Sequence, residues 1–324
     1  MPALPRTVAV IDIGSNSIKL LVAAAAPDGG VLTLAHRTEE TRIGTGITGN
    51  PPRLQPDPMR RAAASVQTLA AAAGPFEPVR TVVVATSAVR DAVNRNDFRD
   101  LIRTACGLEL RVLTGEEEAR YIARGILCDP GLAGTDAFYL FDLGGGSMEL
   151  LAIDHAVPVA LASLPLGCVR LTEKLVADPS RPLPSEAIAA VREEVAAVVG
   201  ASGFAFSLPA GSPAVVTGGT ATTFRAMQAA ASGKPIEETA PTIAVADLAA
   251  LAETLAAETI EQRRARPGLP PKRADVIPVA LLTLAETARL AGVDTLRHSF
   301  FNLRYGLAAE LLEQAEAAAR PAED

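Results

Sequence analysis

Short apolar runs joined by a glycine-containing turn open the chain. One apolar run covers residues 8–12 and leads into the turn Gly14-Ser-Asn-Ser17, and a second run covers residues 18–26. Apolar runs of this length on either side of a tight turn predict a strand, a turn and a strand. A third strand is predicted over residues 31–41.

Helices and strands then alternate up to about residue 127. The apolar spacing and the capping residues predict, in order, a helix over 57–73, a buried strand over 79–85, a helix from Asn96 to Gly107, a strand over 108–113 and a helix from Thr114 to Leu127. The first part of the chain is therefore expected to form a complete α/β unit before residue 130.

The opening pattern occurs a second time in the middle of the chain. A predicted strand over 137–141 leads into Asp142-Leu-Gly-Gly-Gly-Ser147, and another apolar run covers 148–153. The segments DIGSNSIKLLVA, from Asp12, and DLGGGSMELLAI, from Asp142, share Asp, Gly, Ser and a Leu-Leu pair in register, 130 positions apart. Chance similarity between short glycine hairpins is the alternative, but duplication of one structural unit explains the pattern better.

A third glycine turn is predicted where a strand meets a helix. The strand covers 215–217, the turn is Gly218-Gly-Thr220, and the helix covers 221–230. The N–H groups at a helix N-terminus can bind anions. Elsewhere in this half, helices are predicted over 185–199, 246–264, 274–290 with a local break at Pro278, and 302–319, and a strand over 295–299.

Length and composition narrow the class of protein. At 324 residues the chain exceeds what one core usually supports, so two domains with a cleft between them are expected.

The net charge of −7 argues against non-specific nucleic-acid binding, which requires many Lys and Arg contacts with phosphate. No signal peptide or membrane-spanning segment is evident, so a cytoplasmic protein without a membrane partner is expected. The widely spaced Cys106, Cys128 and Cys168 favour reduced thiols, and a homodimer is the default oligomer.

Carboxylates occupy matching places in the two repeats. Asp12 and Asp142 end equivalent strands, and Glu149 lies just inside the second hairpin. Hard oxygen ligands of this kind suit Mg²⁺, which usually takes one or two carboxylates together with phosphate oxygens and water. A single Asp at a strand end more often makes a local turn. The duplicated placement favours a metal site.

The glycine turns are candidate phosphate cradles. Glycine lets the backbone N–H groups approach an anion closely, and the serine hydroxyls add further donors. A tight hairpin turn is the structural alternative, but three consecutive glycines are more than a hairpin requires. The candidate residues are Gly14, Ser15, Asn16 and Ser17 in the first turn, and Gly144, Gly145, Gly146 and Ser147 in the second.

Arg90 and the acidic triplet Glu116-Glu-Glu118 are further candidates. Arg90 follows a buried strand and could bind phosphate with both arms of its guanidinium group, although a surface ion pair with Asp91 or Asp97 is an equal alternative. The triplet could supply the general base that phosphoanhydride hydrolysis needs. Thr114-x-x-Glu117 is also a capping box, so the pattern alone leaves the role of the triplet open.

Taken in order, these motifs resemble the exopolyphosphatase/guanosine pentaphosphate phosphatase (Ppx/GppA) family of the actin-like ATPase superfamily. The matching segments are VAVIDIGSNSIKLLV, ATSAVRDAVN, TGEEEARYI, FDLGGGSMEL, SLPLGCVRLTE and VTGGTATT, with weaker matches in RADVIPVALL and FNLRYGL. The resemblance implies an α/β fold of two ribonuclease-H-like domains, each with a mixed five-stranded sheet, facing an interdomain cleft. The implied domains are residues 1–124 with about 303–324, and 125–302.

The resemblance also implies roles for individual residues. The catalytic glutamate falls on Glu117, with Glu118 as the fallback. Asp142 and Glu149 are implied magnesium ligands, and Asp12 is the matching carboxylate in the first repeat. Phosphate contacts are implied for Asn16, Ser17, Arg90, Gly145, Gly146 and Ser147, and Gly218, Gly219 and Thr220 complete the site.

The implied activity is Mg²⁺-dependent release of the terminal phosphate from inorganic polyphosphate, guanosine pentaphosphate or both. The sequence does not separate these two substrates, because both present a terminal phosphoanhydride. Two other functions are compatible with the same turns. One is a non-catalytic regulator that binds guanosine pentaphosphate or tetraphosphate, and the other is an ATP-dependent kinase of the same superfamily. The family's long members carry a further helical domain, and this chain resembles the short two-domain form.

Overall fold

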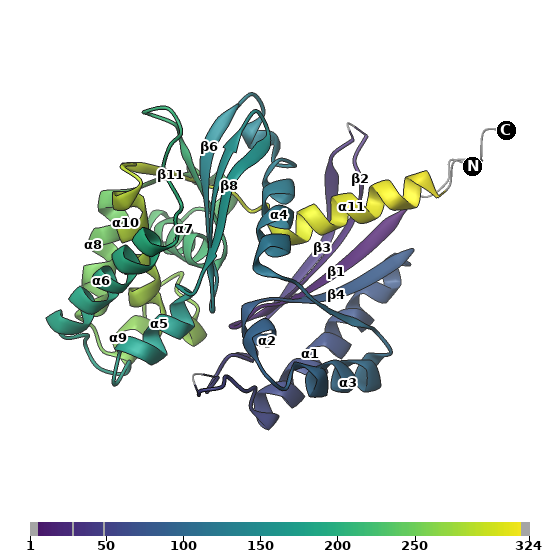
Figure 1. Ribbon diagram of the computed structural model, residues 1–324, viewed down its shortest axis with the longest axis horizontal. Coiled ribbons are helices and arrows are strands. Elements are labelled where there is room, and N and C mark those ends of the chain that lie inside the picture. The colour runs from purple at the N-terminus through teal and green to yellow at the C-terminus, as the bar shows by residue number, and fades with distance from the viewer. Residues whose placement is uncertain (1–5, 28, 48, 319–324) are drawn as a thin grey trace. The chain divides into compact units, whose positions relative to one another are not determined.

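The computed structural model describes residues 6–27, 29–47 and 49–318 (Figure 1). The chain divides into two compact units, each with its own sheet and helices. Unit 1 comprises Met1–Ala133 and Phe301–Asp324, and unit 2 comprises Gly134–Phe300. Both sheets mix parallel and antiparallel strands. The predicted α/β class with two mixed-sheet units is confirmed.

Unit 1 has a five-stranded sheet. Its strands are β1 (Thr7–Ile13), β2 (Ile18–Ala25), β3 (Val31–Glu39), β4 (Arg80–Ala85) and β5 (Leu110–Val112), in the spatial order β3-β2-β1-β4-β5. The first three strands form an antiparallel meander, whereas β4 and β5 run parallel to β1. The carboxyl ends of β1, β4 and β5 therefore lie at one edge of the sheet.

Helices cover both faces of this sheet (Figure 1). They are α1 (Pro56–Ala73), α2 (Ser87–Asp91), α3 (Arg95–Cys106), α4 (Gly115–Ile126) and α11 (Leu303–Ala317), with short 3₁₀ turns at Gly74–Phe76 and Pro130–Leu132. Ile11 and Ile13 share a buried cluster with Val66 and Leu69 of α1. Val8 and Val10 alternate with them along β1 and are also fully buried, and α11 packs on β1 and β2. Because helices pack against both faces of the sheet, β1 carries apolar side chains on both of its faces.

Two glycines allow α4 and α11 to pack closely within unit 1. A side-chain carbon on Gly306 would collide with the backbone carbonyl of Tyr121. One on Gly125 would collide with the carbonyl of Asn302. No larger residue fits at either position without displacing backbone, so this contact ties the last helix of the chain to unit 1.

Unit 2 has a six-stranded sheet, one strand more than expected. The strands are β6 (Ala137–Leu143), β7 (Met148–Asp154), β8 (Val157–Leu164), β9 (Ala214–Thr217), β10 (Thr242–Ala244) and β11 (Thr295–His298), in the order β10-β11-β9-β6-β7-β8. Strands β9 and β11 run parallel to β6. The extra strand is β10, a three-residue strand that pairs with the edge of β11 in antiparallel fashion.

The helices of unit 2 depart from the prediction at three places, the first of which is an unpredicted helix over Cys168–Leu175. The helices are α5 (Cys168–Leu175), α6 (Ser185–Ala201), α7 (Gly219–Ser232), α8 (Val245–Ala256), α9 (Ile260–Arg264) and α10 (Ile277–Leu290), with 3₁₀ turns at Ile236–Glu238 and Pro271–Arg273. The helix expected over 246–264 is split, because Thr259 caps a new helix. The break expected at Pro278 is wrong, because this proline lies in the first turn of α10, where its missing N–H is not needed.

Each sheet begins with a hairpin, β1–β2 in unit 1 and β6–β7 in unit 2, and the two hairpins have the same geometry. Within each turn, the N–H of the first glycine donates to the carbonyl of the last serine over 3.0 Å, from Gly14 to Ser17 and from Gly144 to Ser147. The strands on either side pair in the same register. The duplication predicted from sequence is therefore present in the fold.

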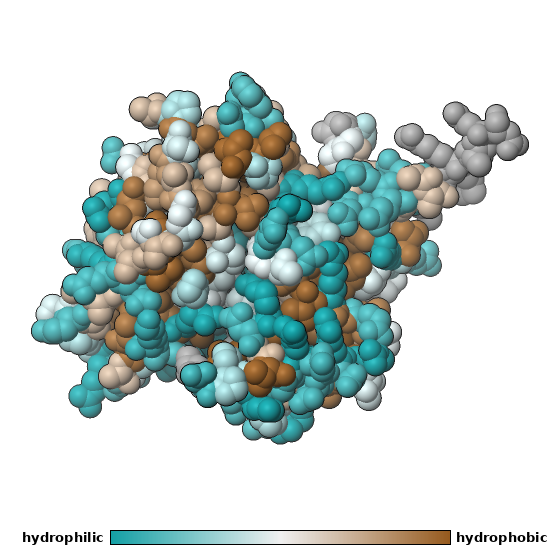
Figure 2. All heavy atoms as spheres, viewed as in Figure 1, coloured by the Kyte–Doolittle hydropathy of each residue, from teal (hydrophilic) through white to brown (hydrophobic). Residues whose placement is uncertain are grey.

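Apolar side chains are exposed on part of unit 2. Figure 2 shows hydrophobic residues among polar ones over the face that carries β6 and β8 in Figure 1. Val157 and Val159 on the edge strand β8 are 58% and 59% exposed. Among residues 6–27, 29–47 and 49–318, no helix has the length and hydrophobicity to cross a membrane.

Candidate active site

The first glycine turn of unit 1 is held in place by a neighbouring segment. Gly44 N donates to the carbonyl of Ser15, and Arg42 N donates to the carbonyl of Asn16, both over 3.0 Å. Ser15 Oγ lies 3.1 Å from Ser87 Oγ at the start of α2. The carbonyls of Ser15 and Asn16 are therefore occupied by protein donors, and Gly14 N–H is used within the turn, where it donates to Ser17. Asn16 Oδ1 is buried and has no hydrogen-bond partner among the described residues.

Asp12 ends β1 directly before this turn. Its Oδ1 is buried and lacks a hydrogen-bond partner in the described part of the chain. Burial raises the pKa of Asp12, while the nearby Lys19 and Arg304 act in the opposite direction. Lys19 is the cross-strand partner of Asp12, so the two side chains share one face of the hairpin. An unsatisfied buried carboxylate oxygen is expected to gain a partner when a cation or a hydrogen-bond donor binds.

Arg90 and Glu118 form an ion pair beyond the ends of β4 and β5. Arg90 Nη1 lies 2.6 Å from Glu118 Oε2 and also donates to the carbonyl of Leu113 over 3.2 Å. The Glu118 side chain is 8% exposed and that of Arg90 is 19% exposed. The alternative partner Asp91 is at 3.9 Å. Arg90 is therefore held against the acidic triplet, a few residues beyond the glycine turn's partner Ser87.

Glu117 has a different environment from Glu118. Its Oε2 accepts from Thr114 N over 2.8 Å, and Thr114 Oγ1 accepts from Glu117 N, which confirms the predicted capping box. Its Oε1 accepts from Arg111 Nη2 over 2.6 Å. The hydrogen bond from Thr114 N, followed by that from Arg111, lowers the pKa of Glu117. Both carboxylate oxygens of Glu117 are thus engaged in holding the start of α4.

The second glycine turn, in unit 2, is held by α5. Cys168 N and Val169 N donate to the carbonyls of Gly144 and Gly145 over 3.0 and 2.8 Å, and Arg170 Nε donates to the carbonyl of Gly146 over 2.8 Å. This is the arrangement of unit 1 repeated: the segment after the third strand occupies the turn's carbonyls. Because the carbonyls of the turn are occupied, an anion would be bound by backbone N–H groups other than that of Gly144, which donates to Ser147.

Two carboxylates face each other beside this turn. Asp142 on β6 is the cross-strand partner of Glu149 on β7, so both side chains lie on the same face of the hairpin. Glu149 is 1% exposed, and its Oε1 accepts from Ser163 Oγ over 2.8 Å. In unit 1 the equivalent pair is Asp12 and Lys19, of opposite charge. Two like charges at the same place in unit 2 fit a divalent cation.

The donor set therefore fits the expected magnesium ion. Asp142 and Glu149 supply two hard oxygen ligands, and substrate oxygens and water commonly complete the coordination of Mg²⁺. No group of three or more His, Cys, Asp or Glu side chains able to hold a metal occurs among the described residues. A site with only two protein carboxylates depends on the substrate for affinity.

The third glycine turn adjoins the same carboxylates. Gly218 has φ 95° and ψ −179°, a conformation that glycine adopts readily. A Cβ on Gly218 would lie 2.5 Å from Asp142 Oδ1, so the glycine permits the turn to approach this carboxylate. Gly219 begins α7, and Thr220 is 1% exposed. The N-terminus of α7 thus lies beside Asp142.

Arg273 was not among the residues predicted from the sequence. Its guanidinium group lies directly against Gly219, close enough that a side-chain carbon at that position would collide with it. A positive charge at the N-terminus of α7 strengthens the preference of this turn for an anion. The weakly matching segment RADVIPVALL contains Arg273, but its proximity to Gly219 arises only from the tertiary fold.

The candidate residues thus form one group in each unit. In unit 1, Asp12 and the turn from Gly14 to Ser17 follow the end of β1, and the Arg90–Glu118 pair lies beyond the ends of the neighbouring β4 and β5. Glu117 faces Thr114 and Arg111. In unit 2 the structure brings together Asp142, the turn from Gly144 to Ser147, Glu149 and the turn from Gly218 to Thr220. In both units these residues follow the carboxyl ends of parallel strands, where ligands of open α/β sheets usually bind.

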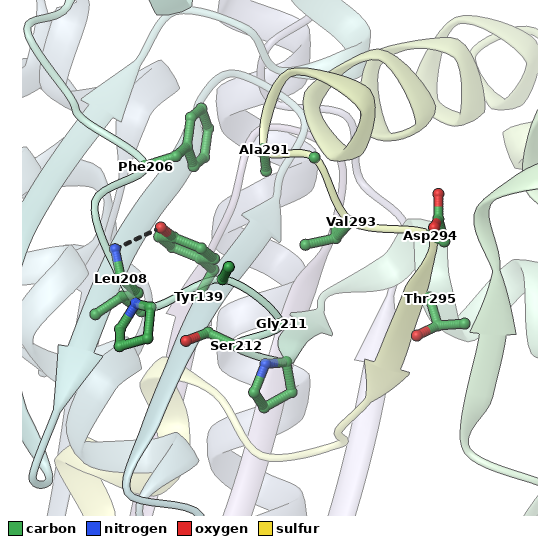
Figure 3. A pocket seen from close by; sticks show the side chains of 13 residues that line it. Tyr139, Phe206, Leu208, Gly211, Ser212, Ala291, Val293, Asp294 and Thr295 are labelled. Atoms are coloured by element: carbon green, nitrogen blue, oxygen red, sulfur yellow. Dashed lines mark hydrogen bonds between the residues drawn. The ribbon is translucent and has the colours of Figure 1, made fainter.

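A separate cavity lies at the opposite edge of the unit 2 sheet. It has a volume of about 620 Å³ and is lined by the starts of β6 and β11 and the loop before β9. Figure 3 shows Tyr139, Phe206 and Val293 along its wall, with the Tyr139 hydroxyl accepting from Leu208 N over 2.7 Å. Because Tyr139 is near the beginning of β6 and Asp142 near its end, this cavity is separate from the candidate phosphate site.

The duplicated hairpins, their glycine turns and the facing carboxylates belong to an α/β protein with the arrangement expected for phosphate binding. A model of the Ppx/GppA phosphatase family matches residues 21–315. The chain therefore belongs to the Ppx/GppA phosphatase family, as the sequence motifs predicted.

Known proteins agree with this assignment over nearly the whole chain. Exopolyphosphatase 2 of Mycobacterium tuberculosis is 34% identical over 322 residues, which cover 95% of this chain and 99% of that protein. The PPX-GPPA enzyme of Aquifex aeolicus has a similar structure, with a TM-score of 0.76, 26% identity and coverage of 95% of this chain and 100% of that one. An exopolyphosphatase from Cytophaga hutchinsonii shares the fold, with a TM-score of 0.84, 22% identity and coverage of 95% and 98%.

Proposed function

We propose that this protein is a Mg²⁺-dependent phosphohydrolase that releases the terminal phosphate from inorganic polyphosphate, guanosine pentaphosphate or both. The observation that carries the proposal is the partly buried ion pair between Arg90 and Glu118, because it joins the residue proposed to bind phosphate to the carboxylate proposed to act on water. The similarity to an exopolyphosphatase supports polyphosphate as the first substrate to test.

The proposal assigns the general base to Glu118 in preference to Glu117. Glu117 holds Thr114 N and Arg111 with its two oxygens, so using it as a base would disturb the start of α4. Glu118 Oε2 is bonded to Arg90, the candidate phosphate ligand. A base must lie close to the water that attacks the phosphorus, and the water must lie close to the bound phosphate. Glu118 meets this requirement through Arg90.

The remaining residues bind and orient the substrate. The N–H groups of the turns at 14–17, 144–147 and 218–220 supply donors to phosphate oxygens, and Arg273 adds positive charge at the last of them. Asp142 and Glu149 hold Mg²⁺, which when bound neutralises charge on phosphate oxygens. Glu118 orients the attacking water and accepts its proton, so the reaction needs no covalent enzyme intermediate.

The experiment that tests the proposal measures phosphate release in the presence of Mg²⁺. Short polyphosphate, long polyphosphate, guanosine pentaphosphate and ATP are compared for the native protein and for Glu118→Gln. Release from polyphosphate or guanosine pentaphosphate that the substitution abolishes supports the proposal and names the substrate. If all four substrates stay intact while guanosine pentaphosphate binds, the protein is a regulator. Transfer of phosphate to an acceptor other than water indicates a kinase. A cytoplasmic location and a homodimer stay predictions.

A further inference from the structure

A chain of hydrogen bonds in unit 2 connects a buried arginine with the turn before α7. Arg225, on α7, is 2% exposed, and its Nη1 lies 3.0 Å from Nδ1 of His298. The other ring nitrogen of His298, Nε2, lies 3.2 Å from Thr222 Oγ1. Thr222 Oγ1 in turn donates to the carbonyl of Gly218 over 2.9 Å. The chain therefore ends on the backbone of the third glycine turn.

Arg225 fixes the direction of every bond in this chain. A guanidinium group has donors only, so Nδ1 of His298 must accept and the ring proton must be on Nε2. Nε2–H then donates to Thr222 Oγ1, which is left to use its own proton for Gly218. Burial, together with the charge of Arg225, lowers the pKa of His298 to about 3. The neutral ring that the chain requires is therefore the form present at neutral pH.

The far end of the chain is anchored to a separate segment. Arg225 Nη2 donates to the carbonyls of Ile236 and Thr239 over 2.6 and 2.7 Å, and to Thr239 Oγ1 over 2.8 Å. His298 is itself fixed at the end of β11, where its backbone N–H donates to the carbonyl of Pro241 over 2.8 Å. With both Arg225 and His298 held, the position of the Thr222 hydroxyl is determined by its surroundings.

The near end of the chain acts on the residue that contacts Asp142. Two donors converge on the carbonyl of Gly218, the N–H of Thr222 at 3.3 Å and its hydroxyl at 2.9 Å. They fix the peptide of a glycine whose φ of 95° allows many alternatives. Since a Cβ on Gly218 would lie 2.5 Å from Asp142 Oδ1, a shift of this peptide moves the surface against which the carboxylate rests.

We infer that Arg225, His298 and Thr222 are positioning residues that hold Gly218 against Asp142 and thereby set the place of this carboxylate. The role of Asp142 as a magnesium ligand rests on the proposed function, whereas the hydrogen-bond chain does not. Groups that orient a metal ligand commonly affect metal affinity by about 10-fold to 100-fold when removed.

The test uses three variants of the full chain. Thr222→Val removes the hydroxyl at nearly constant volume, and Thr222→Ser keeps it. Thr283→Val is the matched control, because Thr283 is fully buried in α10 and its hydroxyl also donates to a carbonyl four residues earlier, that of Val279, over 2.8 Å. Calorimetric titration with Mg²⁺ measures metal affinity, and amide hydrogen exchange measures the order of the turn at 218–220.

The inference requires two results from Thr222→Val. Mg²⁺ affinity falls about tenfold and amide exchange at Gly219 and Thr220 becomes faster, while Thr222→Ser and Thr283→Val stay within about twofold of the native protein. If Thr222→Val keeps the Mg²⁺ affinity of the native protein and the native rates of amide exchange at Gly219 and Thr220, the inference is overturned. If Mg²⁺ binding to the substrate-free protein is too weak to measure, the exchange result alone decides: faster exchange only in Thr222→Val upholds the positioning role, and unchanged exchange overturns it.

Discussion

Arg90 Nη1 and Glu118 Oε2 lie 2.6 Å apart beyond the carboxyl ends of two neighbouring parallel strands. Glu117, one residue earlier, faces Arg111 and the backbone of Thr114. Two adjacent glutamates in the first turn of α4 thus have different hydrogen-bond partners. This difference allows the two residues to be distinguished by one pair of substitutions.

We expect Glu118→Gln to reduce phosphate release by about 100-fold to 10,000-fold, the usual contribution of a general base. Glu117→Gln is the matched control. Glutamine can still close the capping box, so only the exposed pair with Arg111 is lost, at a cost of about 1 kcal/mol of stability or less. Steady-state rates and urea unfolding of both variants check this prediction. A large loss of activity in Glu117→Gln with an active Glu118→Gln would reverse the assignment.

Gly218→Ala should impair the proposed magnesium site. The substitution places a methyl group 2.5 Å from Asp142 Oδ1 and adds backbone strain of about 1–3 kcal/mol at φ 95°. Gly211→Ala is the control, because Gly211 also has a positive φ, of 83°, but no heavy atom lies within 4 Å of its added carbon. Both variants should lose stability, and only Gly218→Ala should lose Mg²⁺-dependent phosphate release, by at least about tenfold. Equal activity in the two variants would show that the contact with Asp142 has no functional role.

His298 should make the stability of the protein depend on pH in mildly acid solution. Its pKa is lowered from 6.5 to about 3 in the folded state, so the unfolded chain binds a proton below about pH 6.5 that the folded protein does not. Stability therefore falls with decreasing pH, by about 1.4 kcal/mol per pH unit well below 6.5 and above 3. Urea unfolding of the native protein and His298→Gln at pH 7, 6 and 5 measures the two slopes.

The variant is expected to have the shallower slope, since it lacks the group that takes up the proton. His155→Gln is the control, because it removes a histidine whose side chain is 82% exposed. Indistinguishable slopes for the native protein and His298→Gln would contradict the prediction.

Gly306→Ala should destabilise unit 1. The added carbon collides with the carbonyl of Tyr121, and relief requires α4 and α11 to move apart, at about 1–3 kcal/mol or more. Gly200→Ala on α6 meets no heavy atom within 4 Å and should stabilise its helix by up to about 1 kcal/mol. Urea unfolding followed by circular dichroism compares the two. Equal stability of both variants would mean that the helices adjust without cost.

Local patterns in the sequence predicted the glycine turns and their strands well. A turn such as Gly144-Gly-Gly-Ser147 depends on residues adjacent in sequence, and its repetition after 130 positions identified the two units. Strand β8 and helix α5 were not assigned, and β10 is only three residues long. Strand β10 and helix α5 are stabilised by contacts with β11 and with the second turn, which are distant in sequence. Strand β8 pairs with β7 across the two-residue turn His155-Ala156, where both residues have positive φ but neither is glycine, so the usual turn signal is missing.

The same distinction between local and long-range contacts explains which parts of the candidate site could be predicted from the sequence. The capping box of Thr114 and Glu117 spans three residues and was recognised, but it could not show which glutamate faces Arg90, 28 residues from Glu118. The contact between Arg273 and Gly219 and the chain from Arg225 to His298, 73 residues apart, depend on helix packing in the same way. Residue types can be read from sequence, whereas their partners require the tertiary structure.

The close packing of α4 and α11 has a consequence for synthesis on the ribosome. Residues 134–300 form unit 2 from one continuous stretch, whereas unit 1 needs Leu303–Ala317, which are made after unit 2 is finished. Domains usually fold in the order in which they emerge. In this protein the face of the unit 1 sheet that α11 covers stays exposed until residues 303–317 have been synthesised. Unit 2, although it is synthesised after most of unit 1, is therefore expected to reach its native state first.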